Sequence, residues 1–334
     1  HVPAPAKEIT AGSLAGPVPR GRPVARRNVG PMRYGIFGGA VNDGTLDDVV
    51  AEAASAERDG FAAYWAPHIF GLDALTALAV VGTKVPRIEL GTSVVPTFPR
   101  HPHAIAQQAH TVAAASGNRF TLSIGLSHKI VIENMFGLSY DKPVRHLREY
   151  LKVLMPLSRN EPANFDGEMY RVHAGISAKG STGFGVVVAA LGEQMLRVTA
   201  ALADGTLTWC TGPVTLGAHI VPTITRAAEE FGRPAPRVIA ALPVCVTADR
   251  QSAAARAAEV FAAYGALPSY RAMLDREGVA GPADIAIIGT AGEVQERIAA
   301  LAGIGVTEFA AVEFGATPDE VADTREALKG LLTG

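Results

Sequence analysis

The chain has 334 residues, of which 48% are hydrophobic and 19% are charged. This balance predicts a well-buried globular protein and excludes a chain that stays unfolded. The formal net charge of −2 offers no basic surface for nucleic acid or anionic lipid. No apolar run reaches the roughly 18 residues that span a bilayer. We therefore expect a soluble, cytoplasmic protein that binds neither nucleic acid nor membrane.

Residues 1–31 differ in composition from the rest of the chain. Proline and glycine recur there, arginines cluster between Arg20 and Arg27, and apolar periodicity is missing. The pair at 26–27 is followed by Asn-Val-Gly-Pro rather than by the apolar stretch of an export signal. Such a segment buries too little apolar surface to offset its ordering entropy. We interpret residues 1–31 as a flexible extension, natural or left from cloning, and residues 32–334 as one domain.

From Met32 onward, strand-like runs alternate with Ala-rich amphipathic stretches of helical length. The predicted strands are Arg33–Gly39, Phe61–Pro67, Ile88–Pro96, Phe120–Gly125, Gly185–Leu191, Thr206–Cys210, Val238–Val246 and Glu308–Phe314. The predicted helices are Leu46–Asp59, Asp73–Lys84, His103–Ala115, Val144–Ser158, Glu193–Ala203, Val214–Phe231, Arg250–Tyr264, Ala291–Ala302 and Asp319–Leu332. This alternation indicates a parallel sheet, and eight such units are typical of a closed (β/α)₈ TIM barrel. The missing GxGxxG after the first strand counts against an open nucleotide-binding sheet.

The region between the fourth and fifth predicted strands holds an insertion. Besides one helix, it contains a turn flanked by short strand-like pieces at Phe165–Val172. An insertion at this face of a barrel can shape the substrate mouth, or it can cover the side of the barrel. The pattern leaves both interpretations open.

The C-terminal ends of barrel strands carry the active site, so their polar residues are the first candidates. The second strand ends at His68, which can exchange a proton near neutral pH. The fourth strand ends in Gly125, which permits close approach of a ligand, followed by Ser127 and His128. Each histidine taken alone fits a structural loop residue as well as a catalytic one.

The third and fifth strands end in small residues. The third reads Gly91-Thr92-Ser93-Val94, which can lay backbone against a flat ring. The fifth reads Ala189-Ala190-Leu191-Gly192 and opens directly into a helix, whose free N–H groups can hold a phosphate. Cys210 and Cys245 match neither a redox pair nor a zinc spacing, and we interpret them as buried thiols. We expect no metal site.

Together these segments resemble the luciferase-like superfamily, and within it the coenzyme F420-dependent oxidoreductases. The similarity spans Met32–Gly334 and is carried by Ala-Pro-His-Ile-Phe (66–70), Gly-Thr-Ser-Val-Val-Pro-Thr (91–97), Asn-Arg-Phe (118–120), Ile-Gly-Leu-Ser-His (124–128), Ala-Ala-Leu-Gly (189–192) and Ala-Asp-Gly-Thr (203–206). The resemblance implies a reduced deazaflavin coenzyme, with His68 beside its reactive ring as an acid/base or orienting group and His128 as a second catalytic candidate. It also implies a non-proline cis bond between Ser93 and Val94.

The remaining coenzyme contacts follow from the same resemblance. The bulge at Thr92–Val94 would back the ring, and Gly125, Ser127 and the segment Ala189–Gly192 would line the ring edge and the phosphate. One departure concerns the sugar-phosphate dehydrogenases of this family, which carry a glutamate where His128 stands. Their Lys- and Arg-rich pocket is also not recognisable here.

This departure favours a reductase that transfers hydride from F420H2 to a C=C or C=N bond of a small, uncharged or weakly charged organic substrate. Arg-over-Lys usage in an Ala-rich chain is associated with organisms in which such reductases serve specialised metabolism. Two alternatives stay open, namely an FMN-dependent luciferase-like monooxygenase and a non-catalytic flavin-binding barrel. Formation of a homodimer is left open as well.

Overall fold

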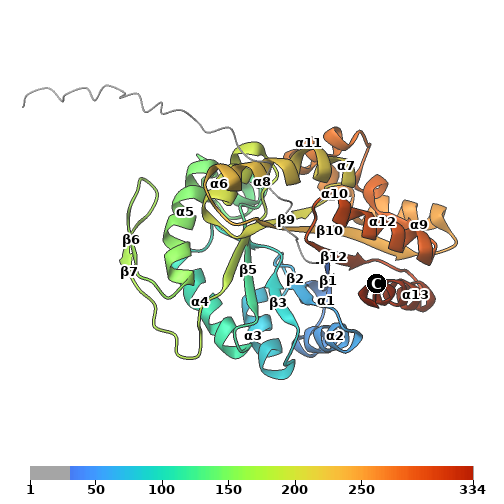
Figure 1. The fold of residues 1–334 in the computed structure, drawn as a ribbon, viewed down its shortest axis with the longest axis horizontal. Coiled ribbons are helices and arrows are strands. Elements are labelled where there is room, and N and C mark those ends of the chain that lie inside the picture. The colour runs from blue at the N-terminus through green and yellow to red at the C-terminus, as the bar shows by residue number, and fades with distance from the viewer. Residues whose placement is uncertain (1–30, 334) are drawn as a thin grey trace, which may run out of the picture. The chain divides into compact units, whose positions relative to one another are not determined.

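Eight parallel strands close into a barrel in the computed structural model, which describes residues 31–333 (Figure 1). The barrel strands are β1 (Arg33–Phe37), β2 (Ala63–Ala66), β3 (Glu89–Thr92), β5 (Phe120–Gly125), β8 (Gly185–Val188), β9 (Gly205–Trp209), β10 (Arg237–Val246) and β12 (Glu308–Glu313). Each pairs with the next along the chain, and β1 pairs with β12, as in Gly35 beside Ala310. The predicted TIM barrel is confirmed.

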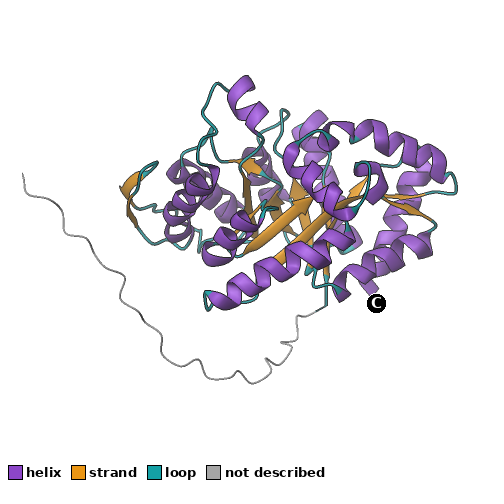
Figure 2. Ribbon diagram, turned by 90° about the horizontal axis from the view of Figure 1, so that it is seen from above, coloured by secondary structure: helices purple, strands orange, loops and turns teal. Residues whose placement is uncertain are grey.

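Helices lie outside the strands, as Figures 1 and 2 show. The principal ones are α2 (Leu46–Asp59), α3 (Ala74–Lys84), α4 (Pro102–Ala115), α5 (Pro143–Ser158), α6 (Glu193–Leu202), α8 (Val221–Glu230), α9 (Arg250–Val260), α12 (Ala291–Gly303) and α13 (Pro318–Gly330). Local signals set their ends. Thr45 and Asp48 form a capping box before α2, and Gly60 ends that helix with a φ of 94°. Pro102 begins α4, where its missing N–H costs nothing.

A small set of apolar side chains fills the barrel interior. It consists of Ala63, Trp65, Val187, Leu207, Ile239, Ala241 and Ala310. Trp65 is the largest and is fully buried. Gly91 on the neighbouring strand makes room for it, because a Cβ there would lie 2.3 Å from the indole ring. The barrel is therefore a packed core, and ligands can reach only its ends.

The stretch between β10 and β12 departs most from the sequence-based prediction. The predicted helix Arg250–Tyr264 breaks into α9 and α10 (Ala262–Gly265). Beyond it lie α11 (Pro268–Glu277), the 3₁₀ turn Pro282–Ile285 and the short strand β11 (Ile287–Gly289), which the sequence analysis missed. The helix Val214–Phe231 is likewise composite, because a π-helical turn at Leu216–Ile220 separates α7 (Pro213–Thr215) from α8.

Other short elements also escaped prediction. These are α1 (Ala40–Asp43), a π-helical turn at Val131–Met135, the strand β4 (Val95–Pro96) as a piece separate from β3, and the closing 3₁₀ turn Leu331–Thr333. Each is five residues or shorter. Such lengths hold too few apolar residues for a helical or strand period to show.

The insertion between the fourth and fifth barrel strands is a hairpin held against α5. Its strands, β6 (Ala163–Asp166) and β7 (Arg171–Ala174), pair antiparallel. The Glu149 carboxylate on α5 accepts the backbone N–H groups of Glu168, Met169 and Tyr170 at 3.2, 2.7 and 3.2 Å. Figure 1 shows the hairpin on the outer side of α5. Of the two interpretations, the one in which the insertion covers the side of the barrel fits this placement.

The extension predicted at residues 1–31 lies, apart from Pro31, outside the described residues. The remaining chain, from Pro31, forms one compact unit. Within residues 31–333, no helix is both long and apolar enough to cross a membrane.

Candidate active site

Four neighbouring strands deliver the predicted site residues to the same end of the barrel. The strand order β2, β3, β5, β8 sets their C-terminal ends side by side. Backbone hydrogen bonds join these ends, from Ser93 N–H to the Ala66 carbonyl at 2.7 Å and from Ala189 N–H to the Ile124 carbonyl at 2.8 Å. His68, the Ser93–Val94 segment, Gly125–His128 and Ala189–Gly192 therefore share one rim, which we call the mouth.

The Ser93–Val94 peptide is cis, as the resemblance implied. Val94 packs on Gly125 so closely that a Cβ on that glycine would lie 2.6 Å from Val94 Cγ2 and 3.3 Å from the Ala189 side chain. Three strand ends thus meet at Gly125. The Thr92 hydroxyl already has two partners within the protein. It donates to the Ser123 carbonyl and accepts from the Ser123 N–H, both at 2.8 Å.

His68 has hydrogen-bond donors at both ring nitrogens. The Ala74 N–H lies 3.2 Å from Nδ1, and the Arg100 guanidinium lies 3.2 Å from Nε2. A neutral imidazole accepts at only one nitrogen. If Nδ1 accepts from Ala74, the proton is on Nε2, where Arg100 cannot receive it. Arg100 instead has Asp73 as an acceptor, at 2.8 Å. Both ring nitrogens of His68 thus face donors of the protein, and the tautomer decides which of the two contacts is a hydrogen bond.

The charge state of His68 follows from its surroundings. Burial lowers the pKa of the imidazole below its ordinary 6.5, and the positive charge of Arg100 lowers it further. Asp73 opposes this change but does not cancel it. His68 is therefore neutral at neutral pH, which suits a hydrogen-bonding or proton-exchanging group better than a fixed positive charge.

His128 lies at the end of β5, next to an aromatic wall. Its ring centroid is 5.2 Å from that of Tyr270 on α11, and burial lowers the pKa of its imidazole. Ser127 before it has a φ of 58°, a conformation that non-glycine residues seldom adopt. Within residues 31–333, the His128 ring forms no side-chain hydrogen bond. The ring is therefore held by packing alone.

Thr206 on the neighbouring strand β9 holds the end of β8, and α6 begins a few residues later. The Thr206 hydroxyl donates to the Val188 and Ala190 carbonyls at 2.9 and 3.2 Å. Gly192 caps α6 without a side-chain hydrogen bond, which leaves the first-turn N–H groups to an external acceptor. Added space exists there, because a Cβ on Gly192 would meet nothing within 4 Å. The predicted phosphate cradle is open in this structure.

Aromatic side chains that the sequence analysis did not single out surround the mouth. Trp209, at the end of β9, has ring centroids within 5.5 Å of Tyr264 and 6.0 Å of Phe37. Tyr264 in turn lies 5.6 Å from Tyr270. Burial raises the pKa of the Tyr270 phenol well above its ordinary range, so the hydroxyl stays neutral. The wall could not be predicted because α11, which carries Tyr270, has no clear apolar period.

The loop after β3 is buttressed from α5. Phe98 stacks on His146 with ring centroids 3.9 Å apart, and His146 Nε2 lies 2.8 Å from the Thr97 hydroxyl. Burial lowers the pKa of His146 to about 4. A neutral, bonded His146 therefore fixes the loop that carries Arg100.

Unpaired polar atoms test whether the mouth suits a flavin-like ring. Ser93 Oγ and Trp209 Nε1 are buried and have no hydrogen-bond partner. Buried polar groups are normally satisfied, so each unpaired atom requires an explanation. A flat, heteroatom-rich ring at the mouth would supply partners for them, with its phosphate at the start of α6. The described residues fit such a coenzyme.

Comparison with known proteins gives a consistent picture. The sequence model of the luciferase-like monooxygenases matches residues 32–331. A candidate coenzyme F420-dependent oxidoreductase of Mycobacterium tuberculosis is 30% identical over 224 residues, or 60% of this chain and 62% of that protein. The 5,10-methylenetetrahydromethanopterin reductase of Archaeoglobus fulgidus is 27% identical over 153 residues, or 46% of each chain. The chain thus spans less than two thirds of the length of either relative.

The fold has solved counterparts as well. The coenzyme F420-dependent tetrahydromethanopterin reductase of Methanopyrus kandleri superposes with a TM-score of 0.76 at 20% identity. The match covers 91% of this chain and 98% of that chain. At this level of identity the similarity establishes the fold.

Proposed function

The chain belongs to the luciferase-like monooxygenase family, and on that premise we propose that it is a coenzyme F420-dependent reductase. It transfers hydride to a C=C or C=N bond of a small organic substrate. The observation that carries a flavin-like coenzyme is the pair of buried polar atoms without partners at the mouth, Ser93 Oγ and Trp209 Nε1. The preference for F420 comes from relatives whose names carry it, among them the Mycobacterium tuberculosis protein.

Each part of the mouth has a separate role in this proposal. When bound, a reduced deazaflavin supplies hydride, and carbon in place of the flavin N5 leaves it nearly inert to oxygen. The first turn of α6 holds the phosphate, and the Val94 bulge supports the ring. Neutral His68 orients the ring or exchanges a proton with the substrate. The aromatic wall of Trp209, Tyr264 and Tyr270 excludes water.

The charges at the mouth support the proposed substrate class. Arg100 is bonded to Asp73, and the two histidines have lowered pKa values, so the site presents little free positive charge. A phosphorylated sugar would need unpaired cations. An uncharged or weakly charged conjugated substrate fits better. We propose a cytoplasmic enzyme that acts on such small molecules, with specialised metabolism as its setting and a homodimer as its assembly.

A second candidate function is supported by the family itself, whose description is monooxygenase. In that case FMN would occupy the same mouth and activate oxygen. The phosphate position at α6 and the ring position at Val94 serve either coenzyme. The two proposals therefore differ in coenzyme and oxygen chemistry rather than in the residues used.

Coenzyme binding separates the two proposals. Purified protein is titrated with oxidised F420 and with FMN, and binding is followed by fluorescence. We expect tighter binding of F420, and no substrate-dependent oxygen uptake with the reduced coenzyme. Tight binding of FMN with oxygen uptake, and none of F420, would establish the monooxygenase instead. Binding of neither would leave the barrel without the proposed coenzyme chemistry and would refute both.

A further inference from the structure

The outer wall of the barrel carries a groove of about 500 Å³ between α5 and α6, whose lining includes Gln194 on the first turn of α6. Its apolar lining consists of Val144, Val198, Ala201, Leu202 and Phe231. Phe231, at the C-terminal end of α8, is 49% exposed. The Phe231 ring therefore adds exposed aromatic surface to this apolar lining.

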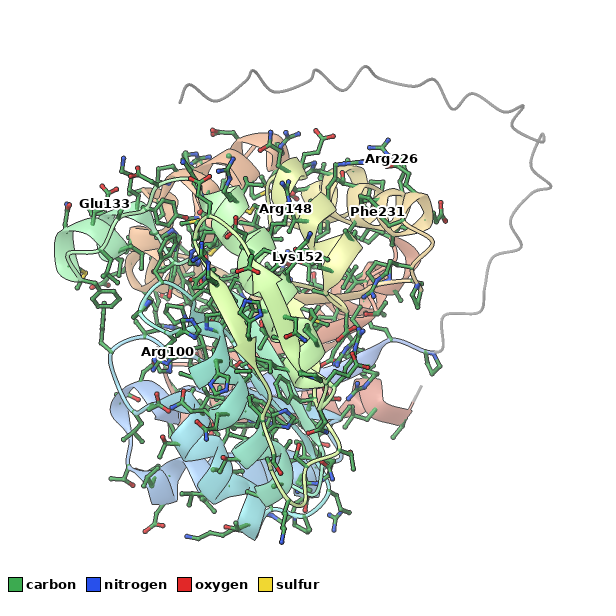
Figure 3. The ribbon with its side chains drawn as sticks, turned by 90° about the vertical axis from the view of Figure 1, so that its left-hand side faces the viewer. Arg100, Glu133, Arg148, Lys152, Arg226 and Phe231 are labelled. Atoms are coloured by element: carbon green, nitrogen blue, oxygen red, sulfur yellow. The ribbon has the colours of Figure 1, made fainter. Side chains whose placement is uncertain are left out.

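Three cationic side chains also line the groove. Val144, Arg148 and Lys152 follow one another at intervals of four residues on α5. Residues spaced in this way lie on the same face of a helix, so the three form one stripe. Arg197 approaches from α6, with its guanidinium 5.7 Å from the centre of the Phe231 ring. Figure 3 shows Arg148, Lys152 and Phe231 on the same side of the molecule.

The charges around the groove are not balanced. The lining contains no carboxylate, and the nearest ion pair joins Arg197 to Glu230 at 2.8 Å. Within the part of the chain that the structure describes, neither Arg148 nor Lys152 forms a salt bridge. The Lys152 ammonium only lies 5.8 Å from the Phe165 ring. A hydrophobic surface thus lies beside two cations that have no anionic partner.

We propose that this groove binds a small amphipathic carboxylate, with its hydrocarbon part along the apolar lining and its carboxylate at Arg148 and Lys152. The volume is within the range of small-molecule sites. Burial of a hydrocarbon chain supplies affinity in proportion to its area, and charge-assisted hydrogen bonds fix the orientation. The cations of this site come from α5 rather than from the strand ends that form the mouth, although Gln194 at the start of α6 lines the groove as well.

The lining favours a small molecule over a protein partner. Val144 to Lys152 spans only about 12 Å of helix at 1.5 Å per residue. A stable protein interface needs a surface that is several times larger than one such strip. A fatty-acid-sized ligand needs no more than the groove already provides.

The test uses sodium decanoate as the probe, titrated into the full-length protein by calorimetry. We expect binding at one site per chain, and much weaker binding of 1-decanol, which has the same tail without the charge. The double variant Arg148→Glu with Lys152→Glu should weaken decanoate binding about tenfold or more. The variant Ala201→Trp, which fills the groove, should abolish it. Circular dichroism and thermal melting verify that each variant is folded.

A matched double variant, Lys129→Glu with Arg171→Glu, makes the same change in net charge at exposed positions outside the groove. It should bind decanoate like the wild type. Three outcomes overturn the proposal: no binding to the wild type, equal binding of decanol and decanoate, or equal losses in both double variants. If charge reversal in the groove changes the sedimentation coefficient but not decanoate affinity, the groove is an interface between copies. None of these outcomes depends on F420 binding.

Discussion

The two ends of the barrel differ in how their charged and polar side chains are paired. At the N-terminal end, Arg237 bonds to Glu89 at 3.0 Å and to Glu308 at 2.8 Å, and Arg33 bonds to Glu89 at 2.6 Å. Glu308, which is 1% exposed, also accepts from the Trp65 indole at 2.7 Å. At the mouth, by contrast, buried hydrogen-bonding atoms are left without partners. We call the paired charges at the N-terminal end the closed network, and they stabilise the fold. The unpaired atoms at the mouth can instead form hydrogen bonds to a ligand.

The difference explains why a polar cavity of about 430 Å³ at the N-terminal end is not a second active site. Its lining includes Arg33, Glu89, Arg119 and Arg237. Burial alone would raise the pKa of Glu89, but the charges of Arg237 and Arg33 outweigh it and lower the pKa. Every charged side chain that lines the cavity already has an ionic partner or a backbone acceptor. The cavity therefore offers no unpaired charge that a substrate would bind.

The largest expected effect comes from opening the closed network. Glu308→Gln keeps a group that can accept from the Trp65 indole but leaves Arg237 and Arg33 without one of their carboxylates. Breaking a buried ion pair on one side costs about 3 kcal/mol. We expect urea unfolding to show a loss of this size. Coenzyme affinity of the folded fraction should change less than twofold, because the mouth lies at the other end.

A surface pair provides the control for that experiment. Glu326 pairs with Lys329 at 2.7 Å, and its side chain is 74% exposed. Glu326→Gln removes the same charge and should leave the unfolding midpoint unchanged. If Glu308→Gln were equally silent, the closed network would not be what stabilises that end of the barrel.

The eight barrel strands could be predicted from the sequence because each one is a short apolar run. Such a run either alternates with polar residues or is apolar throughout, and both patterns are typical of strands. Phe120–Gly125 and Leu46–Asp59 match the structure to the residue. The sequence did not predict α11, whose residues are mostly polar and only two of which are buried, Met273 and Leu274. Elements that lean on the barrel from outside depend on tertiary contacts, which local periodicity does not encode.

The candidate site was predicted in part for the same reason. Residues at strand ends, such as His68 and Gly125, follow from topology once the barrel is assumed. Trp209 lies inside a predicted strand, but its role at the mouth depends on Tyr264 and Tyr270 meeting it from a segment more than fifty residues away. Arg100 was visible in the sequence, yet only its distance to Asp73 and His68 shows what it does.

The second prediction tests the role of His68 at the mouth. His68→Asn retains a side-chain oxygen that can accept from the Ala74 N–H and removes the group at Nε2. We expect hydride transfer to slow by roughly 10²-fold, the lower end for a positioned acid/base, with little change in the melting temperature. Single-turnover kinetics with saturating reduced F420 measure this rate. A wild-type rate in the variant would make His68 a structural residue and His128 the next candidate.

The pH dependence of the wild type sharpens the same point. The folded-state pKa of His68 is lowered, so its neutral form persists below 6.5. Its contribution to stability is complete above the unfolded-state pKa near 6.5 and is lost as the pH falls through the lowered folded-state value. The hydride-transfer rate should therefore be flat from pH 7 to 6.5 and decline at lower pH. His68→Asn should remove that decline.

The smallest effect separates packing from ligand contact at the mouth with two glycines. Gly125→Ala places a methyl group 2.6 Å from Val94 Cγ2, so it should destabilise the protein by about 1–3 kcal/mol and weaken F420 binding. Gly192→Ala adds a methyl group in open space with an ordinary φ of −75°. It should leave the unfolding free energy within about 0.5 kcal/mol of the wild type. It should still weaken F420 binding severalfold, because the phosphate approaches α6 there.

Gly303→Ala, also unobstructed and at the far end of α12, is the control that should change neither quantity. Equal F420 affinity in Gly192→Ala and Gly303→Ala would move the phosphate away from α6 while leaving the packing at Gly125 as described.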